Sequence, residues 1–167
     1  MRRTPTALSL LLAVAITGCA MSPKLESYRP KNADESAIVS TLLKIPYGMK
    51  ARALDILLQP YAEDVYVGNF YKYLGVAGPT APLGISRADL RGAYSDLFRA
   101  SKESSMDVKD FRLSVTGERA AALARTELLL RYEPGKGQAK EQVFVNDVTW
   151  RLRRTAAGWK IVEEIWE

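Results

Sequence analysis

Acids, tyrosines and one cysteine carry the chemistry that this chain could perform, because it contains no histidine. The lack of histidine excludes mechanisms that use an imidazole, from a Ser-His-Asp triad to a histidine-ligated zinc ion. A disulfide scaffold is excluded as well, since a disulfide needs two thiols and Cys19 is the single cysteine. No metal-ligand spacing is recognisable, and Gly135-Lys136-Gly137 lacks the pattern of a phosphate-binding loop. We therefore expect neither a metal ion nor a cofactor.

Glu163 is the acid with the most unusual sequence surroundings. It stands between Ile161 and Ile165 in a segment of alternating apolar residues, and strict alternation places it on the same strand face as Trp159. A carboxylate on an apolar face must be paired, face a pocket or lie in an interface, because burying it alone costs several kcal/mol. Asn146 raises the same question within a second apolar face, which is formed by Phe144, Val148, Trp150 and Leu152.

The helices that would cover these faces lie in the first half of the chain. Asn32 caps a predicted helix over 33–45, and Pro46 and Gly48 break it. A second apolar stripe, over 51–60, completes a helical hairpin. A third helix opens on a capping box in which Ser86 is followed three residues later by Asp89.

The strands are indicated by a change of hydrophobic period from 3.6 to about two residues after Ser101. Turn signals separate the alternating segments, and an aromatic, β-branched strand precedes the third helix. The predicted strands are 65–73, 111–116, 120–132, 142–154 and 158–166, with a loop over 75–85. Helices followed by an antiparallel meander predict an α+β domain over residues 32–167, in which the N-terminal helices pack on one face of a curved antiparallel sheet.

The first residues have the layout of an export signal. Arg2 and Arg3 form a basic start, and the apolar run of residues 7–16 is too short to span a bilayer permanently. The following Ile16-Thr17-Gly18-Cys19 resembles the lipobox of bacterial lipoproteins. That resemblance implies a signal peptide over residues 1–18, lipidation (palmitate included) of Cys19 and a tether over residues 19–31. An ordinary signal peptide with an incidental cysteine, or a buried N-terminal helix, is the alternative.

Export also determines the expected location and partners. An aspartate directly after the cysteine would resemble an inner-membrane retention signal, but this chain has Ala20 there. We therefore expect an outer-membrane anchor that faces the periplasm. Removing residues 1–18 takes away two arginines and no acid, which leaves 22 basic against 19 acidic residues. This small surplus does not favour nucleic-acid binding.

The order of elements resembles the NTF2-like, or SnoaL-like, superfamily. The resemblance covers about residues 33–167 and is carried by Tyr61-Ala62-Glu63-Asp64-Val65 after the helical pair, the capped third helix, and a terminal hairpin from Trp150 to Gly158-Trp159-Lys160-Ile161-Val162. It implies a cone-shaped barrel with a pocket at its open end, often in homodimers. Because members of the superfamily include isomerases, dehydratases and transport factors, the fold sets no chemistry.

The resemblance assigns roles to the polar residues named above. Glu163 or Asp64 could act as a general acid or base, as pocket acids do in the superfamily's isomerases. The ligand-pocket candidates are Tyr66, Tyr132, Asn146 and Glu163. The alternatives are structural: a hydrogen bond for Asn146, an interface or rim salt bridge for Glu163, and a strand-entry cap for Asp64.

We therefore predict an envelope lipoprotein whose domain binds a small apolar ligand or a protein partner without catalysis. The alternative is an acid–base isomerase or hydratase that uses a pocket carboxylate. A homodimer is expected through the solvated sheet face, which carries Val143 and Val145 among charged residues.

Overall fold

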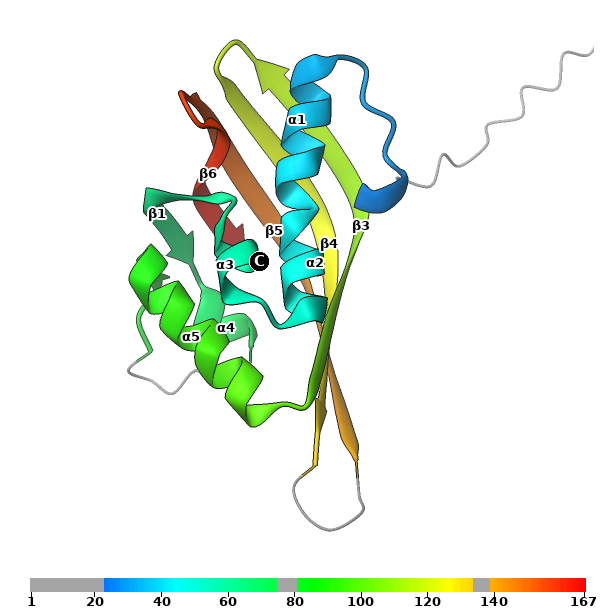
Figure 1. Cartoon of the computed structure of the whole chain (residues 1–167), viewed down its shortest axis with the longest axis vertical. Helices are drawn as coiled ribbons and strands as arrows, with labels where there is room; N and C mark the ends of the chain where they lie inside the picture. Colours follow the sequence, from blue (N-terminus) through cyan, green and yellow to red (C-terminus); the bar gives the residue numbers. More distant parts are fainter. Residues whose placement is uncertain (1–22, 75–80, 134–138) are drawn as a thin grey trace, which may run out of the picture.

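The computed structural model describes residues 23–74, 81–133 and 139–167 (Figure 1). Within these ranges, a 3-10 turn, η1, and five helices occupy mainly the first half, and six strands form one sheet. The helical elements are η1 (Leu25–Ser27), α1 (Ala33–Leu42), α2 (Lys44–Ala51), α3 (Leu54–Leu58), α4 (Phe70–Tyr73) and α5 (Arg87–Ala100). The strands are β1 (Tyr61–Gly68), β2 (Gly84–Ile85), β3 (Glu103–Thr116), β4 (Arg119–Tyr132), β5 (Lys140–Thr155) and β6 (Gly158–Trp166).

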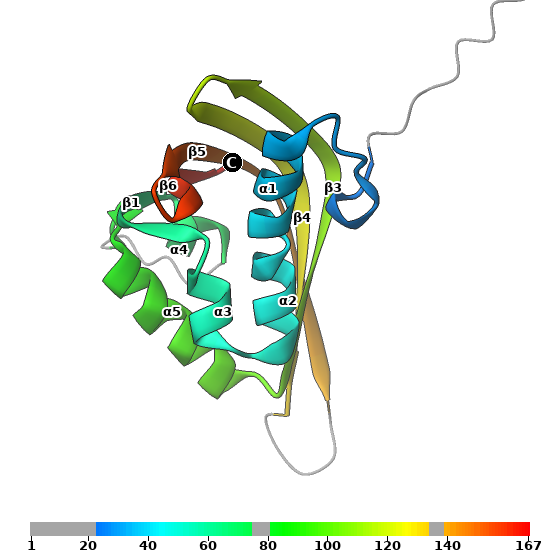
Figure 2. The ribbon, with the colours of Figure 1, turned by 45° about the horizontal axis from the view of Figure 1, so that its top comes forward.

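The sheet is curved and open, with strand order β2-β1-β6-β5-β4-β3. Its concave side holds α1, α2 and α3, and α5 lies across the β1 end (Figure 2). The α+β arrangement and the three long C-terminal strands are confirmed. Two details of the prediction are wrong: the described strands do not close into a barrel, and β1 pairs with β6 in parallel, whereas the other pairs are antiparallel.

The N-terminal helices differ from the predicted hairpin. Asn32 caps α1 as expected, since its side chain accepts a hydrogen bond from the Glu35 backbone N–H at 2.9 Å. The chain then continues into α2 through Pro46. Proline is tolerated in the first turn of a helix, because a backbone N–H at that place has no partner within the helix. Gly48 is a packing residue and not a breaker: a Cβ at this position would lie 2.5 Å from the Leu57 backbone nitrogen. The helix ends at Arg52, which has a left-handed conformation with φ of 54°.

The region between β1 and α5 also departs from the prediction. The strand expected over 65–73 starts earlier and ends at Gly68, after which Asn69 has φ of 61° and the chain forms α4. The predicted capping box of α5 is confirmed, because the Asp89 N–H donates to Ser86 Oγ at 3.2 Å and the Ser86 N–H donates to the Asp89 carboxylate at 3.0 Å.

The segment before α1 is docked on the domain from Pro23 onwards. Leu25 is 1% exposed, the Tyr28 and Phe111 rings meet edge to face at 5.0 Å, and the Phe111 N–H donates to the Pro23 carbonyl at 2.9 Å. The tether expected over residues 19–31 is therefore partly wrong, because its second part belongs to the folded domain. Cys19 and the predicted signal peptide lie outside the described residues. In the described part of the chain, no helix has both the length and the apolar character needed to cross a bilayer.

Candidate functional site

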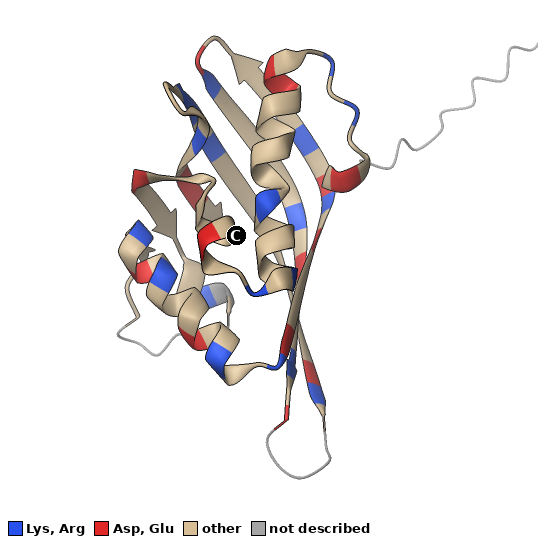
Figure 3. Cartoon of the chain, viewed as in Figure 1, with Lys and Arg blue, Asp and Glu red and all other residues tan. Residues whose placement is uncertain are grey.

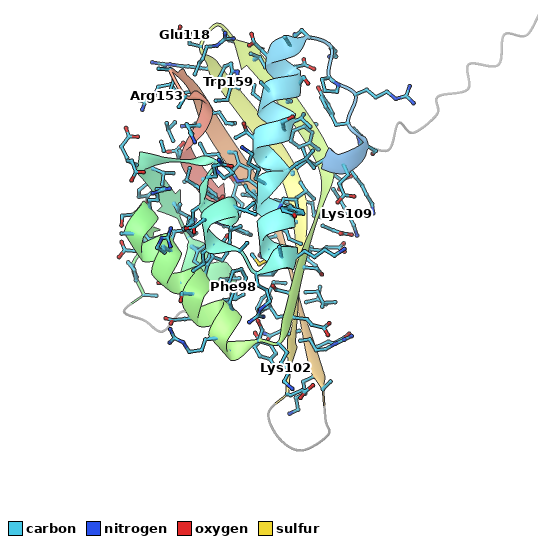
Figure 4. The ribbon with its side chains drawn as sticks, viewed as in Figure 1. Phe98, Lys102, Lys109, Glu118, Arg153 and Trp159 are labelled. Carbon is cyan, nitrogen blue, oxygen red and sulfur yellow. The ribbon has the colours of Figure 1, made fainter. Side chains whose placement is uncertain are left out.

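A mostly apolar pocket of about 230 Å³ lies between α4, α5 and the projecting ends of β4 and β5. Helix α5 presents Ala93, Leu97 and Ala100 to it from one face, as helical spacing requires. Nearby, the Arg52 guanidinium lies over the Phe98 ring, 5.4 Å from its centroid. Figure 4 shows Phe98 and Lys102 toward the same end of the molecule. The pocket is lined by Phe70, Tyr71, Leu74, Ala93, Asp96, Leu97, Ala100, Leu130, Tyr132 and Phe144.

The polar groups of this pocket are few. Among the described residues that line it, Asp96 is the single carboxylate, and it pairs with Arg99 at 3.1 Å on the exposed side of α5. Burial raises the pKa of the Tyr132 phenol above its ordinary value. The phenol is therefore neutral at physiological pH, and it can donate a hydrogen bond but cannot serve as a base. The described lining combines aromatic walls with hydroxyl groups and contains no buried charge.

A second feature, which we call the acid cluster, is centred on Glu164 and includes Tyr61, Trp150 and Trp166. Glu164 is 1% exposed, and its carboxylate accepts hydrogen bonds from the Tyr61 hydroxyl, Trp150 Nε1 and Trp166 Nε1, each at 2.7 Å. Burial raises the pKa of Glu164 above its ordinary value, although the three donors act in the opposite direction. No described cation contacts this carboxylate, so hydrogen bonds alone compensate for its burial.

Phe70 stands between the pocket and the acid cluster. It is 2% exposed and lines the pocket, and its ring meets the Tyr94 and Trp166 rings edge to face at 5.2 and 5.9 Å. Asn69 holds this arrangement in place by donating from its side chain to the Trp166 carbonyl at 3.1 Å. A molecule in the pocket therefore contacts Phe70 and not the Glu164 carboxylate.

The sequence predicted two of the inward-facing polar residues. Tyr132 lines the pocket, and Asn146 lies on the inner face with Val148 and Trp150 as expected. Asn146 is 8% exposed and does not line the pocket, and its Nδ2 has no hydrogen-bond partner among the described residues.

Glu163 is on the opposite face from the one predicted. Along the β5–β6 ladder, Leu152 pairs with Ile161 and the preceding Arg151 pairs with Glu163, so Val162 is an extra residue in β6. Such a bulge reverses the alternation beyond it. Glu163 consequently faces the outer side, where its carboxylate lies 2.8 Å from the Arg151 guanidinium, and Glu164 takes the inward position.

Asp64 and Tyr66 also lie outside the pocket. The Asp64 carboxylate is exposed and contacts Arg153 at 3.2 Å, and Figure 4 shows Arg153 at the opposite end of the molecule from Lys102. Tyr66 is 48% exposed and lies across Gly84, where an added Cβ would be 2.1 Å from its ring. The general acid or base expected from Glu163 or Asp64 is therefore not placed in the pocket.

Glu164 is the inward-facing acid that the sequence reasoning missed. Counting the alternation backwards from Trp166 places Glu164 inward, whereas counting forwards from Trp159 places Glu163 inward. This conflict was the available signal for a bulge. In the described residues, no group of three or more cysteine, histidine, aspartate or glutamate side chains could hold a metal ion.

No model of a known protein family matches the sequence, and no curated protein matches it. Solved structures do match the fold. An NTF2-like protein with a cystatin-like fold from Novosphingobium aromaticivorans has 17% identity and a TM-score of 0.58, with 80% of this chain and 80% of that chain covered. A provisionally named scytalone dehydratase from the same organism has 12% identity and a TM-score of 0.63, with 79% and 81% covered. A ketosteroid isomerase-like protein from Erwinia carotovora atroseptica has 14% identity and a TM-score of 0.58, with 81% and 95% covered. The chain therefore has the NTF2-like, cystatin-like fold that its order of elements predicted.

Proposed function

We propose that the domain binds a small, neutral, apolar ligand in the pocket between α4, α5 and the β4–β5 hairpin, and that it does so without catalysis. One observation carries the proposal: the described pocket wall is aromatic and aliphatic, and Phe70 separates it from the buried carboxylate of Glu164. The volume of about 230 Å³ suits a ligand of one or two rings. Tyr132 supplies a hydroxyl group that could orient a single polar substituent.

The enzymatic alternative has less support from this geometry. An isomerase or hydratase needs a base within hydrogen-bond reach of its substrate. Glu163 and Asp64 lie elsewhere and are paired with arginines, and Asp96 at the pocket is paired with Arg99. Acid–base catalysis at Glu164 would require Phe70 to move first.

Ligand binding can be tested with the neutral, fluorescent two-ring probe 2-naphthol. Ala93→Phe adds a ring inside the pocket, and we expect it to weaken probe binding about tenfold, since lost apolar contact area of this size is worth about 1 to 2 kcal/mol. Ala37→Phe makes the same change at an exposed position on α1 and should leave binding unchanged. Equal probe affinity in the wild type and Ala93→Phe would contradict the proposal.

We also propose, from the sequence alone, that Cys19 carries the lipid of a bacterial lipoprotein and anchors the domain to the outer membrane on its periplasmic side. The basic start, the apolar run and Ile16-Thr17-Gly18-Cys19 support it. Palmitate labelling of the wild type and of Cys19→Ser tests it. Label that persists in Cys19→Ser would end the idea, and mass spectrometry of the purified lipoprotein would reveal a co-purified ligand or protein partner.

A further inference from the structure

The docked N-terminal segment limits the distance between Cys19 and the folded domain. The Pro23 carbonyl is held by the Phe111 N–H of β3, and Lys24 Nζ lies 3.7 Å from Asp107 of the same strand. Residues 20–22 are all that separates Cys19 from Pro23. Four extended residues reach at most about 14 Å. A lipid on Cys19 would therefore hold the β3 edge of the sheet close to the bilayer.

A groove of about 560 Å³ opens at this same edge, between η1, α2 and β3. Its apolar part includes Leu43, Pro46 and Met106, and Tyr47 stands at its side with 63% of its surface exposed. In Figure 1 the dark-blue η1 lies beside β3, the edge strand that forms one side of the groove. The full lining is Glu26, Ser40, Leu43, Lys44, Pro46, Tyr47, Lys50, Ser105, Met106 and Asp107.

The groove lining carries two lysines and two carboxylates, Glu26 and Asp107, and of these the lysines suit the phosphates of a lipid headgroup layer. Lys44 and Lys50 have no ion-pair partner among the described residues, whereas Asp107 is paired with Lys24. Basic residues also mark the front of α2 in Figure 3. Lysines whose stems cover apolar surface, beside an exposed tyrosine, are typical of a protein surface at a membrane interface.

We propose that the face around this groove, which we call the α2–β3 face, lies against the bilayer, with Tyr47 at the headgroup level and Lys44 and Lys50 on lipid phosphates. The proposal rests on the lipidation of Cys19 proposed above. It leaves the apolar pocket, which is built from α4 and α5, away from the bilayer-facing groove.

The test uses the full-length, processed protein, purified and reconstituted into vesicles of phosphatidylethanolamine and phosphatidylglycerol. The photoreactive residue p-benzoylphenylalanine replaces Tyr47 in one sample. In the matched control it replaces Leu83, which is 75% exposed beside β2 at the opposite edge of the sheet. We expect lipid adducts at position 47 and none at position 83. Replacing both Lys44 and Lys50 by glutamine should reduce the adducts at position 47.

Palmitate labelling of the same samples separates the two proposals. Labelled protein without adducts at position 47, or with equal adducts at positions 47 and 83, overturns the membrane-facing orientation and leaves the anchor standing. If the wild type carries no palmitate label and binds vesicles no better than Cys19→Ser does, the anchor and the orientation are both overturned.

Discussion

Glu163 and Glu164 are adjacent in sequence and lie on opposite faces of the same sheet. Glu163 is on the outer face beside the Arg151 guanidinium, whereas Glu164 is buried on the inner face and has three neutral donors. The outer side chain is 29% exposed, and its carboxylate lies beside a cation. The inner carboxylate is buried without a described cation beside it, and its hydrogen bonds must replace the hydration that it loses on folding.

This contrast shows that the environment, and not the residue type, decides what an acid does in this fold. A surface ion pair contributes about 0 to 1 kcal/mol, because both partners stay hydrated. A buried acceptor whose removal leaves three donors without a partner matters more, since each unsatisfied buried group costs about 1 to 3 kcal/mol. The two faces should therefore respond very differently to the same substitution.

Glu164→Gln should have the largest effect. The amide keeps one acceptor oxygen and places an NH₂ group against at least one of the Tyr61, Trp150 and Trp166 donors. We expect the free energy of unfolding to fall by about 2 to 3 kcal/mol, as measured by urea denaturation. An unchanged value would mean that the acid cluster is satisfied by a protonated carboxyl group, whose hydrogen bonds an amide can imitate.

The pH dependence of stability sharpens the same contrast. Burial raises the folded-state pKa of Glu164 above its ordinary value of 4.5. Between 4.5 and the folded-state pKa, the folded protein therefore holds a proton that the unfolded chain has released. The free energy of unfolding should fall as the pH rises through this window, and this slope should be absent in Glu164→Gln. Urea titrations of both proteins at several pH values measure it, and parallel curves would refute the effect.

The outer face should matter for association more than for folding. Leu123, Val143 and Val145 are 45 to 54% exposed there, and we propose that two copies of the chain pair through this face. Light scattering of the wild type at micromolar concentration should give the mass of a dimer, and Val143→Lys with Val145→Lys that of a monomer. The far-UV circular dichroism spectrum should stay unchanged, because within one chain these side chains are exposed and the fold does not depend on them. A monomeric wild type would contradict the pairing.

The sequence predicted the elements whose signals are local. The cap at Asn32, the capping box of Ser86 and Asp89 and the inward face of Asn146 all follow from neighbours within a few residues, and all are confirmed. The order of these elements was also enough to predict the NTF2-like fold.

The failures have a non-local cause. Pro46 and Gly48 are helix breakers by intrinsic propensity, but α3 packs so closely on α2 that glycine is the residue that fits. The bulge at Val162 depends on pairing with β5, which single-strand alternation does not contain. One extra residue was therefore enough to assign the buried acid to the wrong glutamate.

Glu163→Gln should have the smallest effect, and it decides whether the face assignment is right. The change removes the charge that faces Arg151, whose side chain is 66% exposed, and water replaces the lost contact. We expect the free energy of unfolding to change by less than about 1 kcal/mol. Under the regular alternation that the sequence suggested, Glu163 would be the buried carboxylate, and its substitution would reproduce the large loss expected for Glu164→Gln. Comparing the two variants in one urea series distinguishes a bulged β6 from a regular one, because only the bulge makes the second glutamate the sensitive residue.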